Sequence, residues 1–155
     1  MKRLLSLLAV LGLLSGCGGS QDTPEDRVRD LIARGEQAAE ARSLDYFKDT
    51  LSDDYTDAKG NTRKELLRLL TGYYLRNQSI HLWIRVTDVR VLDAGLAEAT
   101  FYASMAGSPG DGLEQLLSLR ADIYRFDLMI DLNNEQILSA EWRRARGEEL
   151  VFGGN

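Results

Sequence analysis

Residues 80–91, IHLWIRVTDVRV, mark the place where the hydrophobic pattern of this chain changes from helical to extended. Apolar residues alternate with polar ones from Ile80 to Val86, and the alternation slips by one residue at Asp88 before it resumes. A period of two is typical of a strand with one buried face, and a slip of one residue is typical of a β-bulge. We therefore expect a bulged strand here, followed by a turn at 93–95.

Three more strands are expected after this turn. Residues 97–105 alternate again, and residues 115–132 predict a long strand whose apolar phase slips after Ile123, which we interpret as a second bulge. The Asn-Asn pair at 133–134 suits a tight hairpin turn because asparagine tolerates positive φ, and residues 137–144 form the last strand. The pattern predicts a four-stranded antiparallel meander that its bulges curve.

Helical periodicity precedes the strands. Thr23 is a capping residue, and it is followed by a proline suited to the first turn and by two acids that favour the positive end of a helix. The apolar spacing after it predicts a helix over about 24–42. Ser43 is expected to cap a second, shorter helix with one apolar face formed by Leu44, Phe47 and Leu51.

A third helix and two connecting segments complete the pattern. Thr62 and Glu65 form a capping box, which predicts a helix that begins there and ends near Asn77. The polar residues 52–61 indicate a loop or a short strand, and the glycine-rich residues 107–112 indicate a loop. Helices followed by strands, rather than alternating with them, indicate an α+β domain.

The order of these elements resembles the nuclear transport factor 2-like cone, the cystatin-like α+β roll shared with ketosteroid isomerases and polyketide cyclases. The run Leu51-Ser52-Asp53-Asp54-Tyr55-Thr56-Asp57, then Gly60, Arg63 and Glu65, carries the local part of the resemblance. The resemblance implies helices packed in the concavity of a curved sheet over residues 24–146. An unrelated α+β sandwich is the alternative fold.

Residues 1–16 are expected to be a bacterial lipoprotein signal. Lys2 and Arg3 precede the apolar run Leu4–Leu14, which is shorter than the roughly 20 residues that a membrane span needs. Leu14-Ser15-Gly16-Cys17 resembles a lipobox, which implies cleavage before Cys17 and acylation of its thiol. An ordinary secretory signal with an incidental cysteine is the alternative.

The resemblance to lipoproteins also divides the chain. It implies a lipid bilayer as partner, through acylated Cys17, and a lipidated tether over residues 17–23. Gly18 and Gly19 stand where an acidic residue would resemble an inner-membrane retention signal, so the periplasmic side of the outer membrane is favoured. Residues 147–155 are expected to be a flexible tail.

Composition excludes several classes of function. Cys17 is the only cysteine, so a lipidated protein has no free thiol, no disulfide and no cysteine-based zinc site. Loss of Lys2 and Arg3 with the signal takes the formal charge from −5 to −7. This argues against nucleic-acid binding and against a basic patch that recognises anionic lipid headgroups, because both need an excess of Lys and Arg.

No catalytic constellation stands out in the sequence. The resemblance implies a carboxylate or histidine base inside the cone with a tyrosine or acid as proton donor. Asp53, Asp54 and Asp57 could each turn inward beside Tyr55 to form such a pair. Acids in a loop rich in Asp and Gly are more often capping or solvated, so these residues are weak candidates.

Metal and cofactor sites are not predicted either. An EF-hand loop with Gly60 at its sixth position would place Tyr55, Lys59 and Leu66 where acidic ligands are required. His81 is the only histidine, and it has no cysteine or histidine partner at zinc-binding spacing. No Gly-x-Ser-x-Gly elbow and no phosphate-binding glycine loop are present, so we expect no cofactor.

The residues out of phase with the apolar set should share the outer, convex face of the sheet. Glu98 is expected there, together with His81, Trp83, Arg85, Tyr102, Arg120, Asp122 and Tyr124. Trp, Tyr and Arg are enriched in protein interfaces, so this face predicts a homodimer or a docked partner. A wet face with scattered aromatic residues is the equal alternative.

These observations favour a membrane-anchored, periplasm-facing module that is not an enzyme. The cone would hold a small apolar ligand or be filled by side chains, since the same alternation serves both. One alternative is a cone-type isomerase or dehydratase that uses a loop aspartate as general base. A further alternative is an assembly factor for another envelope protein.

Overall fold

A five-stranded mixed sheet forms the framework of the protein, in a computed structural model that describes residues 23–105, 112 and 122–151. Its strands are β1 (Leu51–Asp57), β2 (Leu82–Val91), β3 (Leu96–Met105), β4 (Ile123–Asp131) and β5 (Gln136–Arg144). The order across the sheet is β1-β5-β4-β3-β2, with β1 parallel to β5 and all other neighbours antiparallel. The predicted α+β class is confirmed, and the predicted count of four strands is too low by one.

The additional strand, β1, comes from the polar stretch that was expected to be a loop or a short strand. Leu51 and Tyr55 are its only buried side chains, and Asp53 and Asp54 between them are exposed. An edge strand can be this polar because only one of its faces packs on the core. Leu51 pairs with Ile137, so the contact that makes this segment a strand lies far along the chain.

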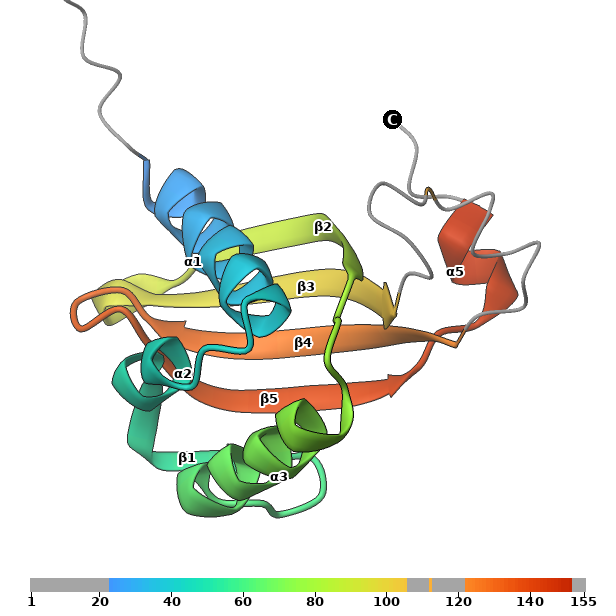
Figure 1. The fold of residues 1–155 in the computed structure, drawn as a ribbon. Coiled ribbons are helices and arrows are strands. Elements are labelled where there is room, and N and C mark those ends of the chain that lie inside the picture. The colour runs from blue at the N-terminus through green and yellow to red at the C-terminus, as the bar shows by residue number, and fades with distance from the viewer. Residues whose placement is uncertain (1–22, 106–111, 113–121, 152–155) are drawn as a thin grey trace, which may run out of the picture.

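Three helices cover one face of the sheet, which we name the inner face (Figure 1). They are α1 (Pro24–Glu40), α2 (Asp45–Thr50) and α3 (Arg63–Arg76). Helix α1 packs against β2 and helix α3 packs against β1, so the two longest helices stand over opposite edges of the sheet. The face that these helices leave uncovered is named the outer face.

The predicted caps of the two long helices are confirmed. The Thr23 hydroxyl accepts a hydrogen bond from the Asp26 backbone N–H at 3.1 Å, and the Thr62 hydroxyl accepts one from the Glu65 N–H at 3.4 Å. Each acid also accepts a bond from the backbone N–H of its threonine, which completes the capping box. The prediction for Ser43 is wrong, because α2 begins after a leucine that makes no side-chain cap.

The strand register confirms one predicted bulge and corrects the other. The β2–β3 pairing shifts between Val86 and Asp88, where the sequence alternation slips. The β3–β4 pairing is continuous from Leu96 opposite Asp131 to Ser104 opposite Ile123, so β4 has no bulge there. A shift occurs instead between β4 and β5, next to Met129. The predicted part of this strand over residues 115–121 lies outside the described residues.

The β4–β5 turn differs from the tight asparagine turn that was predicted. It spans residues 132–135, and the positive φ of 52° belongs to Glu135 rather than to an asparagine. The Asp131 carboxylate instead organises the turn, since it accepts a hydrogen bond from the Asn133 backbone N–H at 2.8 Å. The same turn is held to α1 by Arg27, whose guanidinium donates to the Leu132 carbonyl at 2.5 Å.

The hydrophobic core fills the space between the helices and the inner face. Its members among the described residues lie between Val28 and Ala140, all within residues 21–155. Residues 147–151, at the beginning of the segment expected to be a flexible tail, form the short helix α5 (Gly147–Val151), and Glu149 pairs with Arg143 at 2.8 Å. The rest of that segment, residues 152–155, lies outside the described residues. The predicted signal, Cys17 and the tether up to residue 22 lie outside the described residues.

Candidate functional site

An apolar cavity of about 280 Å³ opens on the inner face of the sheet, and we name it the cone pocket. Helices α1, α2 and α3 and all five strands contribute to its walls. Its lining is largely aliphatic and aromatic and includes Leu31, Phe47, Leu66, Ile84, Phe101 and Phe126. The sequence alternation allowed either a filled core or a pocket at this place, and the structure has a pocket.

The wall formed by α1 and α2 depends on a close approach of a tyrosine to a glycine. The Tyr46 ring packs on Gly35, where an added Cβ would lie 3.4 Å from the ring edge. The Tyr46 hydroxyl donates a hydrogen bond to the Leu31 carbonyl at 2.5 Å. Both contacts fix the short helix α2 on α1, and the ring of Phe47 meets that of Tyr46 edge-on at 5.4 Å.

Stacked aromatic rings form part of the sheet side of the cone pocket. Phe101 on β3 and Phe126 on β4 are opposite each other and stack with centroids 5.0 Å apart and planes within 6°. Trp142 on β5 continues the row at 6.4 Å from Phe126. Large rings held in place by their neighbours give a rigid apolar surface, because such side chains have few rotatable bonds to order on binding.

Within the part of the chain that the structure describes, Glu36 is the only charged residue that lines the cone pocket. Burial against the apolar wall raises the pKa of its carboxyl, and the negative charge of Glu40, one helical turn on, raises it further. No hydrogen bond or ion pair of Glu36 is found among the described residues, whereas the Glu40 carboxylate accepts a bond from the Leu82 N–H at 2.9 Å. The pocket therefore combines a large apolar surface with one unpaired acid.

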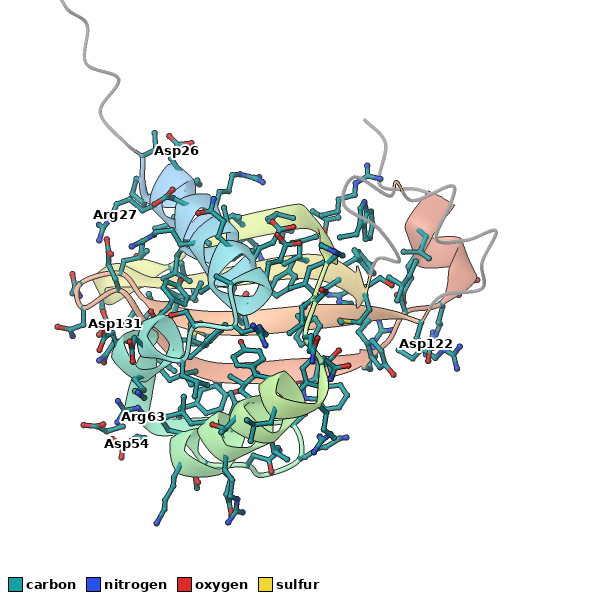
Figure 2. All side chains as sticks on the ribbon, viewed as in Figure 1. Asp26, Arg27, Asp54, Arg63, Asp122 and Asp131 are labelled. Carbon is teal, nitrogen blue, oxygen red and sulfur yellow. The ribbon has the colours of Figure 1, made fainter. Side chains whose placement is uncertain are left out.

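The structure places the three weak catalytic candidates Asp54, Tyr55 and Asp57 in different surroundings. Tyr55 lines the cone pocket, and burial together with the charge of Asp57 raises the pKa of its phenol. Asp54 is exposed and points away from the domain (Figure 2). Asp57 does not line the pocket, so the inward turn considered for the two acids is not seen.

The Asp57 carboxylate is occupied within its own loop. Its oxygens accept hydrogen bonds from the Lys59 and Asn61 backbone N–H groups, both at 2.9 Å, and from the Asn61 side chain at 2.8 Å. Partial burial opposes ionisation, but these bonds outweigh it and lower the pKa of Asp57. A carboxylate held in its ionised form by three donors is a turn organiser and a weak base.

The remaining acid of this loop has a surface role. Asp53 pairs with Arg63 at 2.7 Å, although its own side chain is 91% exposed, so the pair links β1 to the beginning of α3. No cluster of three or more potential metal-ligating side chains occurs within the described residues.

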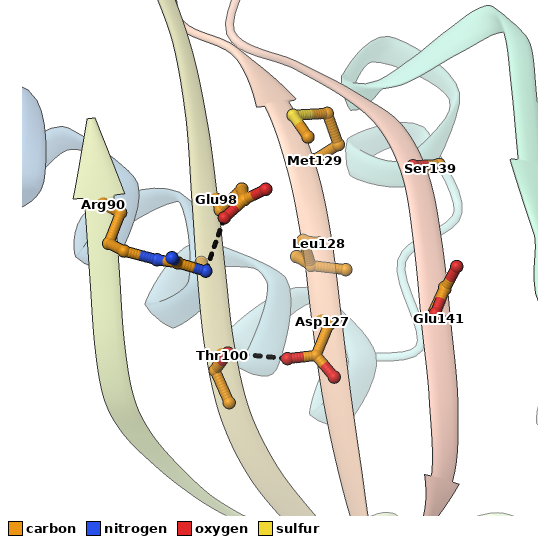
Figure 3. A pocket seen from close by; sticks show the side chains of 9 residues that line it. Arg90, Glu98, Thr100, Asp127, Leu128, Met129, Ser139 and Glu141 are labelled. Atoms are coloured by element: carbon orange, nitrogen blue, oxygen red, sulfur yellow. Dashed lines mark hydrogen bonds and ion pairs between the residues drawn. The ribbon is translucent and has the colours of Figure 1, made fainter. Parts of the chain in front are cut away.

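The outer face of the sheet carries a polar hollow of about 310 Å³ (Figure 3). Arg90 and Glu98 form an ion pair across β2 and β3. The Thr100 hydroxyl donates to the Asp127 carboxylate at 2.6 Å, and Arg125 donates to the same carboxylate at 2.8 Å. The outer position expected for Glu98 is confirmed by this pairing. The charges of Arg90, Glu98 and Asp127 are therefore paired within the chain, while no hydrogen bond or ion pair of Glu141 is found among the described residues.

The predicted interface residues divide between the two faces. The outer face contains Trp83, Arg85 and Tyr102. In the β2–β3 ladder Trp83 is opposite Ser104 and Arg85 is opposite Tyr102, so these side chains lie on the same side of the sheet. Tyr102 is only 6% exposed, so it is buried within the chain. The placement of Tyr124 is wrong: it is opposite Ala103 and lies on the inner face with the aromatic row. Arg120 lies outside the described residues.

Comparisons with known proteins identify the fold. No protein-family model and no curated protein matches the chain. A solved domain of unknown function with a cystatin-like fold, from Nostoc punctiforme, is similar with a TM-score of 0.58 at 18% identity, over 83% of this chain and 82% of that one. A nuclear transport factor 2-like protein of unknown function from Pseudomonas putida gives 0.56 at 18% identity, over 81% and 89%.

A third similar structure, a nuclear transport factor 2-like protein from Cytophaga hutchinsonii, has a TM-score of 0.55 at 12% identity over 77% of this chain and 97% of that chain. Identities this low show the fold and no more. The chain has the nuclear transport factor 2-like, or cystatin-like, fold that the order of its elements predicted.

Glu36 is the site residue that sequence reasoning missed. It lies between Gly35 and Gln37 in a helix whose apolar positions were assigned to a buried face. Glu36 is four residues after Ile32, so the helical repeat predicts that it lies beside the buried face of the helix. This spacing is the sequence feature from which its position could have been predicted. A single glutamate beside an apolar stripe does not by itself predict a binding site. The structure identifies Glu36 as a site residue because it shows a cavity there.

Proposed function

We propose that this protein is a lipid-anchored, non-catalytic module of the cell envelope that binds a small apolar molecule in its cone pocket. The observation that carries the proposal is the cavity of about 280 Å³ with an almost wholly apolar lining. Mostly apolar cavities are the usual form of small-molecule sites in proteins, and this one lies just below their usual range of about 300–1,000 Å³. A protein that used its cone as a core alone would gain stability by filling it, because each unfilled volume costs packing energy.

Binding is favoured over an isomerase or dehydratase that uses a loop aspartate as its base, because of where those aspartates lie. That alternative needs a general base within hydrogen-bonding reach of a molecule in the cone. Asp54 is exposed and Asp57 is held by its own loop, so neither has this reach. Tyr55 remains in the pocket as a hydroxyl whose raised pKa suits hydrogen bonding rather than proton transfer at neutral pH.

The pocket is tested on residues 21–155, exported without the lipid. Native mass spectrometry should detect a co-purified small molecule, and calorimetry should detect binding of n-octanol. Ala103→Trp, which places an indole in the pocket, should abolish both signals. Leu75→Trp, at a side chain 82% exposed on α3, should abolish neither. A wild-type protein that carries no ligand and binds no n-octanol contradicts the proposal.

The anchoring part of the proposal rests on the sequence Leu14-Ser15-Gly16-Cys17 after a short apolar run. No helix within the described residues is long and apolar enough to cross a membrane. Intact-mass measurement should find a chain that begins at Cys17 and carries the added mass of acyl groups. Cys17→Ser should lose both the cleavage and the added mass, and Ser20→Ala should lose neither. A Cys17→Ser protein with unchanged mobility and membrane partition contradicts lipidation.

A homodimer through the outer face is a second candidate, favoured by the partly exposed Trp83 and Arg85 on neighbouring positions of one face of β2. Trp83→Asp in residues 21–155 should halve the mass in solution if two copies meet there, since a buried charge without a partner is costly. Leu75→Asp, on α3, is the matched control. An unchanged mass of a natively folded Trp83→Asp protein contradicts the dimer.

A further inference from the structure

We infer that the cone pocket selects amphiphiles with a cationic head, such as an ammonium group on an apolar body, and that Glu36 is the residue that selects them. This inference rests on the proposed binding function and names the chemical class of its ligand. It begins from the charges of the pocket wall: among residues 23–105, 112 and 122–151, Glu36 is the single charged side chain in the lining and no basic residue contributes to it.

The second step is the state of the Glu36 carboxylate. Other partly buried carboxylates among the described residues have partners; for example, Asp127 is bonded to Arg125 and Glu149 to Arg143. Glu36 has none among the described residues and faces an apolar surface instead. A nearby cation stabilises an unpaired carboxylate against an apolar surface more than it stabilises an exposed carboxylate. The reason is that neither water nor a hydrogen-bond donor fully offsets the negative charge of the partly buried group.

The third step is the neighbourhood of Glu36. Glu40 adds a negative charge on the same helix, and Arg34, the basic residue nearest to Glu36 in α1, is engaged by Asp30 at 3.1 Å and by Glu135 at 3.4 Å. A ligand carboxylate or phosphate would therefore meet repulsion at this wall with no cation to balance it. An ammonium group would meet attraction from both glutamates.

The fourth step is the aromatic content of the pocket. Tyr46, Phe47, Tyr55, Phe101 and Phe126 all line it. The faces of aromatic rings attract cations, and alkylated ammonium groups in particular are bound by walls of several rings. Of the two tyrosine hydroxyls, that of Tyr46 is already committed to the Leu31 carbonyl, so Glu36 remains the main polar group for a ligand head.

The test is a calorimetric comparison of three probes with one eight-carbon chain: n-octylamine, n-octanol and n-octanoate. All three have eight carbons and are expected to bind the same apolar wall; they differ in the head, and n-octanoate has one carbon of the eight in its carboxylate. Wild-type residues 21–155 at neutral pH should bind the amine about tenfold more tightly than the alcohol, and the carboxylate most weakly, as expected for one charge-assisted contact. Glu36→Gln should bring the amine and the alcohol to equal affinity.

The matched control is Glu141→Gln, which makes the same change of residue and of net charge at the outer-face hollow. It should keep the preference for the amine. Equal binding of all three probes by the wild type, or an amine preference that survives Glu36→Gln, overturns the inference and leaves the proposed pocket standing. Failure of all three probes to bind overturns the proposed binding function, and the inference with it.

Discussion

Replacing Ala103 with leucine tests whether the cone pocket is empty in solution. Ala103 lies on the inner face of β3 and contributes to the pocket lining. Leucine adds three carbons, and each buried methylene is worth about 0.8 kcal/mol. Ordering the new side chain costs about 0.5–1 kcal/mol, so a hollow site should gain about 1–2 kcal/mol of unfolding free energy.

Ala99 supplies the matched control. It is on the same strand and the same face, but it is 2% exposed, belongs to the hydrophobic core and does not line the pocket. Ala99→Leu inserts the same atoms into filled space, which costs about 1–3 kcal/mol through displaced neighbours. The preference of leucine over alanine for strands is common to both variants and cancels in the comparison.

Urea unfolding of residues 21–155, followed by tryptophan fluorescence, measures both variants against the wild type. The reasoning predicts opposite signs, with Ala103→Leu stabilised and Ala99→Leu destabilised. Ala103→Leu should also weaken n-octanol binding at least tenfold, because it occupies the ligand's volume. A destabilisation of Ala103→Leu equal to that of Ala99→Leu would refute the reasoning, since it would mean that the site is already filled.

Three further predictions concern stability. Gly95→Ala should destabilise the protein more than Gly60→Ala, although the two glycines have similar φ angles of 77° and 78°. The reason is that a Cβ at Gly95 would lie 2.3 Å from an asparagine side chain, whereas a Cβ at Gly60 meets nothing within 4 Å. Equal urea midpoints of the two variants would contradict this. Burial opposes ionisation of Asp127, but hydrogen bonds from Arg125 and Thr100 outweigh it and lower its pKa. The stability that ionised Asp127 contributes to the folded protein is therefore fully present above pH 3.8, its unfolded-state pKa, and is lost as the pH falls through its lower folded-state pKa. Arg125→Gln should reduce this loss of stability at acidic pH, measured as a flatter acid limb of the stability–pH profile. Tyr74→Phe should raise stability by about 1 kcal/mol in thermal unfolding, because its buried hydroxyl has no partner among the described residues, and a fall in melting temperature would count against this.

The local parts of the fold were predictable because their causes are local. The caps at Thr23 and Thr62 follow from side chains three residues apart, and the β2 bulge follows from a break in alternation. The parallel pairing of β1 was not predictable, since its polar sequence is typical of a loop. Its partner β5 is identified only by the folded structure.

The error at Tyr124 has a specific physical cause. The alternation of β4 breaks between Ile123 and Phe126, and such a break predicts a bulge that would move Tyr124 to the outer face. The ladder runs without a shift there, and Ile123 is 4% exposed on the outer face, where Tyr102 and Ser104 are also buried. A strand buried on both faces at one end produces the same sequence pattern as a bulged strand.

The parallel pairing of β1 with β5 also has a consequence for when this chain can fold. Leu51 meets its partner only at Ile137, so the sheet edge and the cone above it cannot close until nearly the whole chain is present. Contacts between distant segments form late and slow the search for the native state. In an exported protein, which we propose this to be, late closure of this kind favours passage across the membrane before the domain folds.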